Sequence, residues 1–208
     1  LHANGFRAQK GQIVDANIVR VSTQRNTREE NKDIKDGKSI SSWSTAKRRQ
    51  KDTDARWTKK NGKSFFGYKN HVSIDVGHKL IRSYEVTDAS VHDSQVFTEL
   101  LDPRNTRRDV WADSAYRSEN SLIELKEQGF REHIQRKGSR HKKLTTREQQ
   151  GNRSRARIRC RIEHVFGVMA MRTGSTVMRG IGIVRIRAKI GLLTIAYNLS
   201  RYAMLAGT

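Results

Sequence analysis

The sequence predicts an α/β protein in which helices flank a mixed sheet. Short segments that are rich in β-branched residues, or that alternate apolar with polar residues, are typical of strands. Other segments repeat apolar residues every three or four positions, which is typical of helices. The expected order is strand, insertion, hairpin, short helix, strand, helix, strand, helix, helix. This order favours a mixed sheet with helices on its faces.

Five strands are expected, and two of them form a hairpin. The first is rich in Ile and Val, and the second and third alternate apolar with polar residues. The five strands cover residues 11–21, 65–75, 79–87, 109–113 and 130–135. Gly77 lies between the second and third strands, where it indicates a tight turn.

Four helices are expected, over residues 94–101, 118–129, 145–172 and 184–205. Ser94 is suited to cap the first helix, and Gly129 is suited to end the second. The third helix has one apolar stripe at helical spacing, formed by Ile158, Ile162, Val165 and Met169. The last helix is apolar on most faces, so we expect it to be buried.

The chain is long enough for one well-buried core, and we expect a single domain over residues 1–208. After the first strand, residues 22–64 are expected to form a basic, polar insertion. Its first part, residues 22–56, contains almost no large apolar side chains, which predicts a partly disordered segment.

The charge of the chain indicates a polyanionic partner. Lys and Arg number 42 against 21 Asp and Glu, a net charge of +21. Two basic segments, residues 45–69 (net +7) and 131–161 (net +10), flank an acidic centre, residues 71–130 (net −4). Nucleic acid is favoured over a membrane, because no apolar stretch approaches the roughly 20 residues that a span requires. A single cysteine, Cys160, fits a reducing cytoplasm.

Two aspartates lie at positions where strands are expected. Asp15 lies within the first strand, and Asp113 lies at the end of the short strand at residues 109–113. A carboxylate in a strand is disfavoured unless it has a partner, such as a cation or a metal ion. Neighbouring strands can place two carboxylates side by side. The alternative for Asp113 is that it only starts a turn, and the sequence leaves both interpretations open.

Glu163 is the third candidate, at the border between the apolar stripe and the helix surface. It is the only acidic residue after Arg153, and arginines occupy alternate positions before it. The simplest alternative is an ordinary ion pair with Arg159, four residues earlier.

Basic and aromatic residues near these acids are candidate DNA contacts. Arg153, Arg157 and Arg161 lie on one helix face and suit phosphate binding. Trp57 suits stacking on a base, although it can equally pack the insertion against the core. The full candidate set is Trp57, Lys59, Lys60, Lys63, Lys69, Arg153, Arg157, Arg159 and Arg161.

Three motifs in order resemble those of the DDE transposases of bacterial insertion sequences. They are Val14–Ala16, Trp111–Arg117 and Arg159–Gly167, and the segment 54–71 is also similar to the family. The resemblance implies a ribonuclease H-like fold with Asp15, Asp113 and Glu163 as catalytic metal ligands. It also implies two Mg²⁺ ions, with Mn²⁺ as an alternative, acting on terminal inverted repeats and target DNA.

Two features depart from this family. Many members carry a lysine seven residues beyond the glutamate, where this chain has Ala170. Members also have an N-terminal DNA-binding region ahead of the first aspartate, and we expect that this sequence lacks it.

Other functions remain open at this level. A non-catalytic nucleic-acid-binding protein would need only the basic segments. A nuclease of the same fold would cut without joining, and a decayed copy would do neither. A homodimer on paired DNA ends in the bacterial cytoplasm is compatible with the transposase interpretation.

Overall fold

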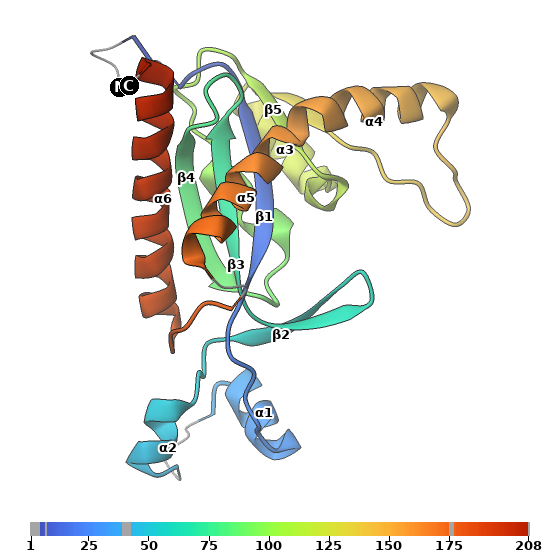
Figure 1. Ribbon diagram of the computed structural model, residues 1–208. Coiled ribbons are helices and arrows are strands. Elements are labelled where there is room, and N and C mark those ends of the chain that lie inside the picture. The colour runs from blue at the N-terminus through green and yellow to red at the C-terminus, as the bar shows by residue number, and fades with distance from the viewer. Residues whose placement is uncertain (1–4, 7, 39–42, 175–176, 208) are drawn as a thin grey trace.

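The computed structural model describes residues 5–6, 8–38, 43–174 and 177–207, and within them a six-stranded sheet has helices against both faces (Figure 1). The strands are β1 (Gln12–Arg20), β2 (Arg56–Lys60), β3 (Lys63–Asp75), β4 (Ile81–Asp88), β5 (Asp109–Ala112) and β6 (Arg131–Ile134). The helices are α1 (Arg28–Lys35), α2 (Thr45–Gln50), α3 (Glu119–Glu127), α4 (Thr146–Arg159), α5 (Arg161–Thr173) and α6 (Ile183–Ala206). The predicted α/β class is confirmed, and the architecture is consistent with a ribonuclease H-like fold.

β1 lies inside the sheet, between β3 and β5. It runs antiparallel to β3 and parallel to β5, and β5 runs parallel to β6. β4 pairs with β3 in antiparallel orientation. In the register of β1 with β5, Val14 lies opposite Ala112, the last residue of β5. The C-terminal end of β5 therefore lies beside the first part of β1.

The two faces of the sheet bury different apolar clusters. Val14, Val110 and Ala112 face the side that α3 covers, where Leu125 packs against them. The opposite face packs against α5 and α6. Its cluster is formed by Ile13, Val72, Ile74, Ile81, Trp111, Ile162, Val165, Met169 and Tyr197. This alternation along β1 follows from the two-residue period of a strand, and it directs Asp15 to the α5 side.

β2 was not predicted, and it forms a hairpin with the first part of β3 that extends away from the rest of the sheet (Figure 1). Asn61 and Gly62 both have positive φ angles, 51° and 77°, as a two-residue type I′ turn requires. At Gly67, where β3 leaves this hairpin, a Cβ atom would lie 2.2 Å from the carbonyl oxygen of Val19. Only glycine allows this approach.

All five predicted strands are present with ends within two residues of those expected. The predicted helix at residues 94–101 is instead two 3₁₀ helices, Asp93–Val96 and Thr98–Leu100, and His92 rather than Ser94 provides the cap. The predicted helix over residues 145–172 is present as α4 and α5. Cys160 separates them but keeps right-handed helical angles, so the chain hardly unwinds.

In the described part of residues 22–56 the chain forms two short helices, α1 and α2, and residues 39–42 lie outside the described residues. The helix α1 is ordered by a capping box of Thr27 with Glu30, and Ser44 caps α2. The buried Asp52 accepts hydrogen bonds from the Tyr68 hydroxyl (2.6 Å) and from the backbone N–H of Gly182 (3.0 Å). Caps and a buried carboxylate thus order a segment that has little apolar surface to bury.

The prediction that α6 is buried on most faces is also wrong. One face packs on the sheet, but Leu192, Ile195 and Leu199 on the opposite face are 68%, 58% and 63% exposed. A helix on the outside of a sheet layer has one side to bury, and in the described part of the chain no further element covers the other. No helix within the described ranges combines the length and apolarity needed to cross a membrane.

Candidate active site

The first two candidate carboxylates lie on neighbouring parallel strands. Because Val14 of β1 is opposite Ala112 of β5, the next residues, Asp15 and Asp113, follow side by side. The Asp113 carboxylate accepts a hydrogen bond from the backbone N–H of Ala115 at 2.6 Å. It thereby caps the short 3₁₀ helix Ser114–Tyr116, which follows β5. Asp113 therefore does start a turn, and the same turn holds its carboxylate beside Asp15.

The third candidate, Glu163, lies in the first turn of α5. Its neighbour Ile162 is fully buried, which fixes the helix so that Glu163 remains 59% exposed at the border of the core. Arg159 donates one Nη to the Asp15 carboxylate and the other to Glu163 Oε1 at 3.0 Å. The ion pair expected within the helix is present, and the same guanidinium also reaches β1.

The electrostatics of these groups show that they form one cluster. Burial raises the pKa of Asp15, while Arg159 and the N–H of Ala16 act against this rise and the charge of Asp113 adds to it. Burial lowers the pKa of Arg159, but Asp15, Glu163 and Asp113 outweigh it and raise the pKa. Two acids thus pair with one arginine, and the charge of Asp113 also acts on it.

The donor set of this cluster suits a hard divalent cation, which prefers oxygen ligands. In the described part of the chain, however, no group of three or more His, Cys, Asp or Glu side chains has the arrangement of a metal site. Asp15 and Glu163 are turned toward the Arg159 guanidinium. Carboxylate oxygens are suitable ligands for such a metal ion. To bind one, the Asp15 and Glu163 side chains have to break their ion pairs with Arg159.

Tyr116 is a residue near the site to which the sequence assigned no role. It is 1% exposed, and its hydroxyl has no hydrogen-bond partner among the described residues. Burial, with smaller contributions from Asp15, Asp93 and Asp113, raises its pKa well above 10. A neutral hydroxyl donor therefore lies beside the carboxylates. Its position three residues after Asp113 is the feature of the sequence that could have indicated that Tyr116 lies near the site.

The hairpin of β2 and β3 carries four of the candidate DNA contacts. Trp57 is 50% exposed and lies against Phe66, with ring centroids 5.3 Å apart. Lys59, Lys60 and Lys63 are exposed near the turn. Lys60 also lies close enough to Asp15 to lower the pKa of that carboxyl. The hairpin is therefore a basic arm with an aromatic side chain, and its tip is near the carboxylates.

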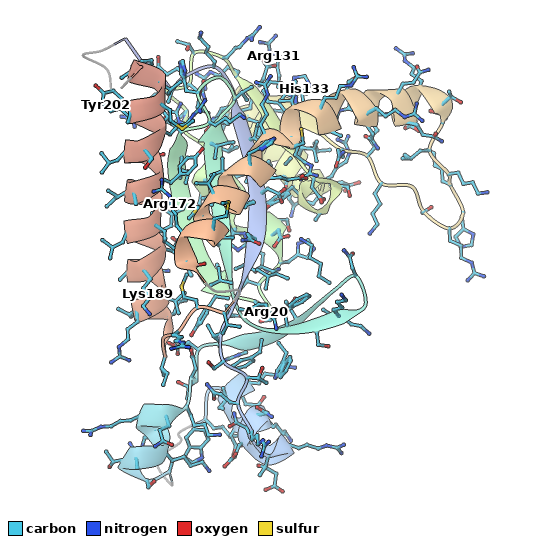
Figure 2. The ribbon with its side chains drawn as sticks, viewed as in Figure 1. Arg20, Arg131, His133, Arg172, Lys189 and Tyr202 are labelled. Carbon is cyan, nitrogen blue, oxygen red and sulfur yellow. The ribbon has the colours of Figure 1, made fainter. Side chains whose placement is uncertain are left out.

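The basic helix α4 extends beyond the edge of the sheet, and its side chains and those of the loop before it project outward (Figure 2). Arg153 and Arg157 are exposed on it. Arg161 begins α5 and donates to the carbonyl of Val76 at 2.9 Å. Lys69 is 14% exposed and is paired with Asp93 at 2.9 Å, so it is already engaged within the fold.

Comparison with known proteins shows the family of this chain. The family model described as "Transposase DDE domain" matches residues 7–199. The chain is 29% identical over 207 residues to the "Transposase for insertion sequence element IS1106" of Neisseria meningitidis serogroup B, covering 98% of this chain and 69% of that protein. No solved structure matches. The chain therefore belongs to the DDE transposase family.

Proposed function

We propose that Asp15, Asp113 and Glu163 are the catalytic carboxylates with which this transposase cuts and rejoins DNA. The observation that carries the proposal is that Asp15 and Glu163 share one guanidinium, that of Arg159, while Asp113 follows the strand next to Asp15. In a chain of net charge +21, acids are expected to spread among the many available cations. Two acids on a single arginine with a third beside them, on the elements that carry the family motifs, indicate a site that favours positive charge.

DDE transposases use divalent metal ions, and we propose two Mg²⁺, or Mn²⁺, at these carboxylates. When bound, such a pair activates the attacking oxygen and stabilises the leaving oxygen of an in-line displacement. Asp15 and Glu163 then release Arg159, whose planar guanidinium is free to donate to a phosphate oxygen. Water attacks the phosphodiester at the element's end and releases its 3′-hydroxyl. That hydroxyl then attacks a phosphodiester of the target strand, and the 3′-oxygen of the target nucleotide leaves as the new bond forms.

The DNA that this transposase acts on is proposed to be its element's terminal inverted repeats and a target duplex. The hairpin arm and α4 supply the phosphate contacts. Binding should weaken with salt at a log–log slope of about −0.9 per neutralised phosphate. Replacing Arg153 and Arg157 by Ala should flatten this slope, whereas replacing Lys38, on the insertion, should not. An unchanged slope in the double variant would show that α4 does not contact DNA.

We further propose that two copies act together through the exposed face of α6. Leu192, Ile195 and Leu199 recur at spacings of three and four, as in a helix–helix seam. Arg185 and Lys189 make the start of α6 basic, whereas Arg201 is the one charged residue among positions 196–206. An antiparallel pair, which keeps the two basic starts apart, is therefore favoured. Sedimentation should show a dimer for the wild type and a monomer for Ile195→Glu. A wild-type chain that stays monomeric with and without DNA would contradict this proposal.

Residues 1–208 are proposed to form one catalytic domain, with residues 22–64 as its insertion, acting in the bacterial cytoplasm. The decisive test of function identifies the DNA products that the protein forms from its element's terminal repeats and a target duplex. A transposase yields metal-dependent cleaved ends and joined strands, a nuclease yields cleaved ends alone, and a binding protein yields neither. Either of the last two results would overturn the proposal.

A further inference from the structure

An open, basic pocket of about 390 Å³ lies between α4 and the loop that joins β6 to α4, whose side chains project outward (Figure 2). Its described wall has one acid, Glu148, and five basic residues, which are Arg117, Arg136, Lys137, Lys142 and Lys143. Arg117 and Arg136 are paired with Glu132 and Glu148, each at 3.0 Å. The three lysines are exposed, and none of them has an ion-pair partner in the part of the chain that the structure describes. The pocket therefore presents positive charge that is available to an anionic ligand.

The pocket begins beside the proposed reaction centre. β5 and β6 run parallel, and their register places Gln135 beside Asp113, with Arg136 next in the chain. Arg117 lies four residues after Asp113 and ends the short 3₁₀ helix that follows β5. In the strand order β2-β3-β1-β5-β6, this side of Asp113 is opposite to the side that carries the hairpin arm. The carboxylates therefore lie between two basic surfaces.

Hydrogen bonds hold the loop in this shape. Asn152 of α4 accepts a hydrogen bond from the backbone N–H of Arg136 at 2.9 Å and donates its side-chain amide to the Arg136 carbonyl at 2.8 Å. Farther along the loop, the Ser139 N–H donates to the Lys142 carbonyl at 2.9 Å, and Ser139 Oγ accepts a hydrogen bond from the Lys142 N–H at 3.0 Å. Because the loop is already ordered, little backbone entropy is lost when its lysines bind a ligand.

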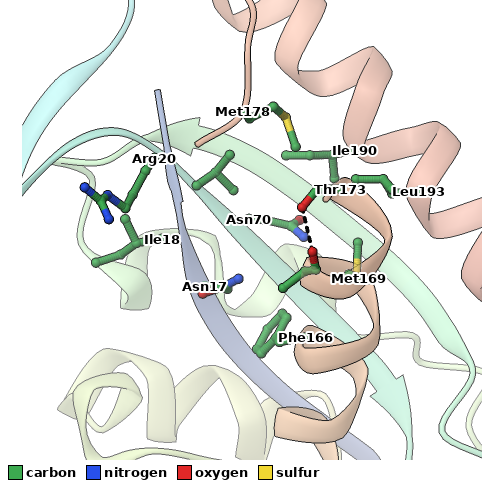
Figure 3. Close-up of a pocket in the computed structure, with 12 residues that line it drawn as sticks. Asn17, Ile18, Arg20, Asn70, Phe166, Met169, Thr173, Met178, Ile190 and Leu193 are labelled. Atoms are coloured by element: carbon green, nitrogen blue, oxygen red, sulfur yellow. Dashed lines mark hydrogen bonds between the residues drawn. The ribbon is translucent and has the colours of Figure 1, made fainter. Parts of the chain in front are cut away.

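A phosphodiester backbone fits this pocket better than a base does. Lys and Arg bind phosphates without regard to sequence, whereas bases are read by stacking and by hydrogen bonds to their edges. None of the side chains described on the pocket wall is aromatic or an amide, whereas the hairpin arm carries the exposed Trp57. The cavity between β1, α5 and α6 is smaller, about 110 Å³, and Arg20 is the one cation on its described wall (Figure 3). The pocket beside α4 is therefore the better match for the backbone of a DNA strand.

We propose that this pocket binds the phosphate backbone of the target duplex while the element's end is held at the carboxylates and the hairpin arm. The inference rests on the proposed function. The end of an element is one fixed sequence and needs contacts to its bases, whereas joining to a target requires only that a phosphodiester be held at the carboxylates. The end of β6 is two strand spacings, or roughly 10 Å, from β1. At about 3.4 Å per nucleotide, the pocket contacts target phosphates from about the third nucleotide beyond the joining position.

Strand joining with pre-cleaved element ends isolates the target step. The variant combines Lys137→Gln, Lys142→Gln and Lys143→Gln. The matched control changes three exposed lysines that lie outside the pocket, Lys32, Lys35 and Lys126, to Gln and has the same net charge. Three lost contacts at a log–log slope of about −0.9 each lower the affinity for the target about 100-fold at ~0.15 M salt, and the deficit fades toward ~1 M. We expect the target concentration that half-saturates joining to rise accordingly in the variant alone, while cleavage at the ends persists.

A second measurement uses the unaltered chain. With pre-cleaved ends bound, added target duplex should protect Lys142 and Lys143 from acetylation, and Lys126 should stay reactive. Pocket lysines that stay reactive, or a half-saturating target concentration that is the same in variant and control, would overturn the proposal. So would an equal loss of end cleavage in the variant, because the pocket would then hold the element's own DNA. A wild type that protects these lysines but joins no strands would refute the proposed function alone.

Discussion

Replacing Arg159 by Ala removes the cation that holds Asp15 and Glu163 together. The side chains of Asp15 and Arg159 are only 16% and 19% exposed, so the aspartate would remain buried beside Asp113 with no opposite charge. Removing one partner of a buried ion pair lowers the free energy of unfolding by about 3–5 kcal/mol. Because this pair keeps some solvent contact, we expect about 2–3 kcal/mol.

A divalent metal should reverse much of this loss. Without Arg159 the pKa of Asp15 rises further, so the deficit is largest above that pKa and shrinks as the pH falls toward the unfolded value of 3.8. At a concentration about 100 times its Kd, Mn²⁺ adds about 2.7 kcal/mol to the stability of the state that binds it. In the wild type, Arg159 competes for the same carboxylates, so Mn²⁺ should stabilise the variant more.

Urea denaturation with and without Mn²⁺ measures both effects, with Arg157→Ala, at an exposed position of α4, as the control. Equal stabilisation of the wild type and Arg159→Ala by Mn²⁺ would refute the idea that the guanidinium occupies the cation position. So would an unchanged stability of the metal-free variant.

Three further predictions concern the scaffold. Ile162→Ala should lower the free energy of unfolding by about 2–5 kcal/mol, because the fully buried side chain anchors α5 to the sheet; a loss below about 1 kcal/mol by calorimetry would contradict this packing. Burial lowers the pKa of His71 to about 4, so stability should fall by ~1.4 kcal/mol per pH unit as the pH drops from 6.5 toward 4. His71→Asn should remove this part of the pH dependence, and an unaltered profile would refute the assignment. Thr145→Ala removes the capping box of α4 and should cost about 1 kcal/mol, and fraying of α4 should appear in hydrogen exchange of its first turn.

The sequence carries enough information to place the three acids on their elements. A β-branched segment predicted β1 around Asp15, and a short apolar segment predicted β5 just before Asp113. The apolar stripe of α5 placed Glu163 at the border of the core. These are local patterns with a period of two or three to four residues, and local patterns are what sequence reasoning detects best.

The features that the sequence did not reveal depend on distant contacts or on polar chemistry. The pair of Arg159 with Asp15 joins residues 144 positions apart. β2 lacks an apolar alternation because its hairpin is solvated, although the Asn61–Gly62 turn was a usable signal. The exposed face of α6 could not be predicted, since its apolar composition is the same whether the protein or another chain covers it.

The most direct measurement of the central claim compares the wild type with Asp113→Asn on the element's own terminal repeats. The substitution keeps the size of the side chain and removes the charge that would hold metal. We expect metal-dependent cleavage and strand joining to fall by orders of magnitude, while DNA binding persists because an acid has been removed from a basic protein. Asp36→Asn, at an exposed position of the insertion, should leave both reactions intact. Joined strands at the wild-type rate from Asp113→Asn, or none from the wild type with Mg²⁺ or Mn²⁺, would contradict the account.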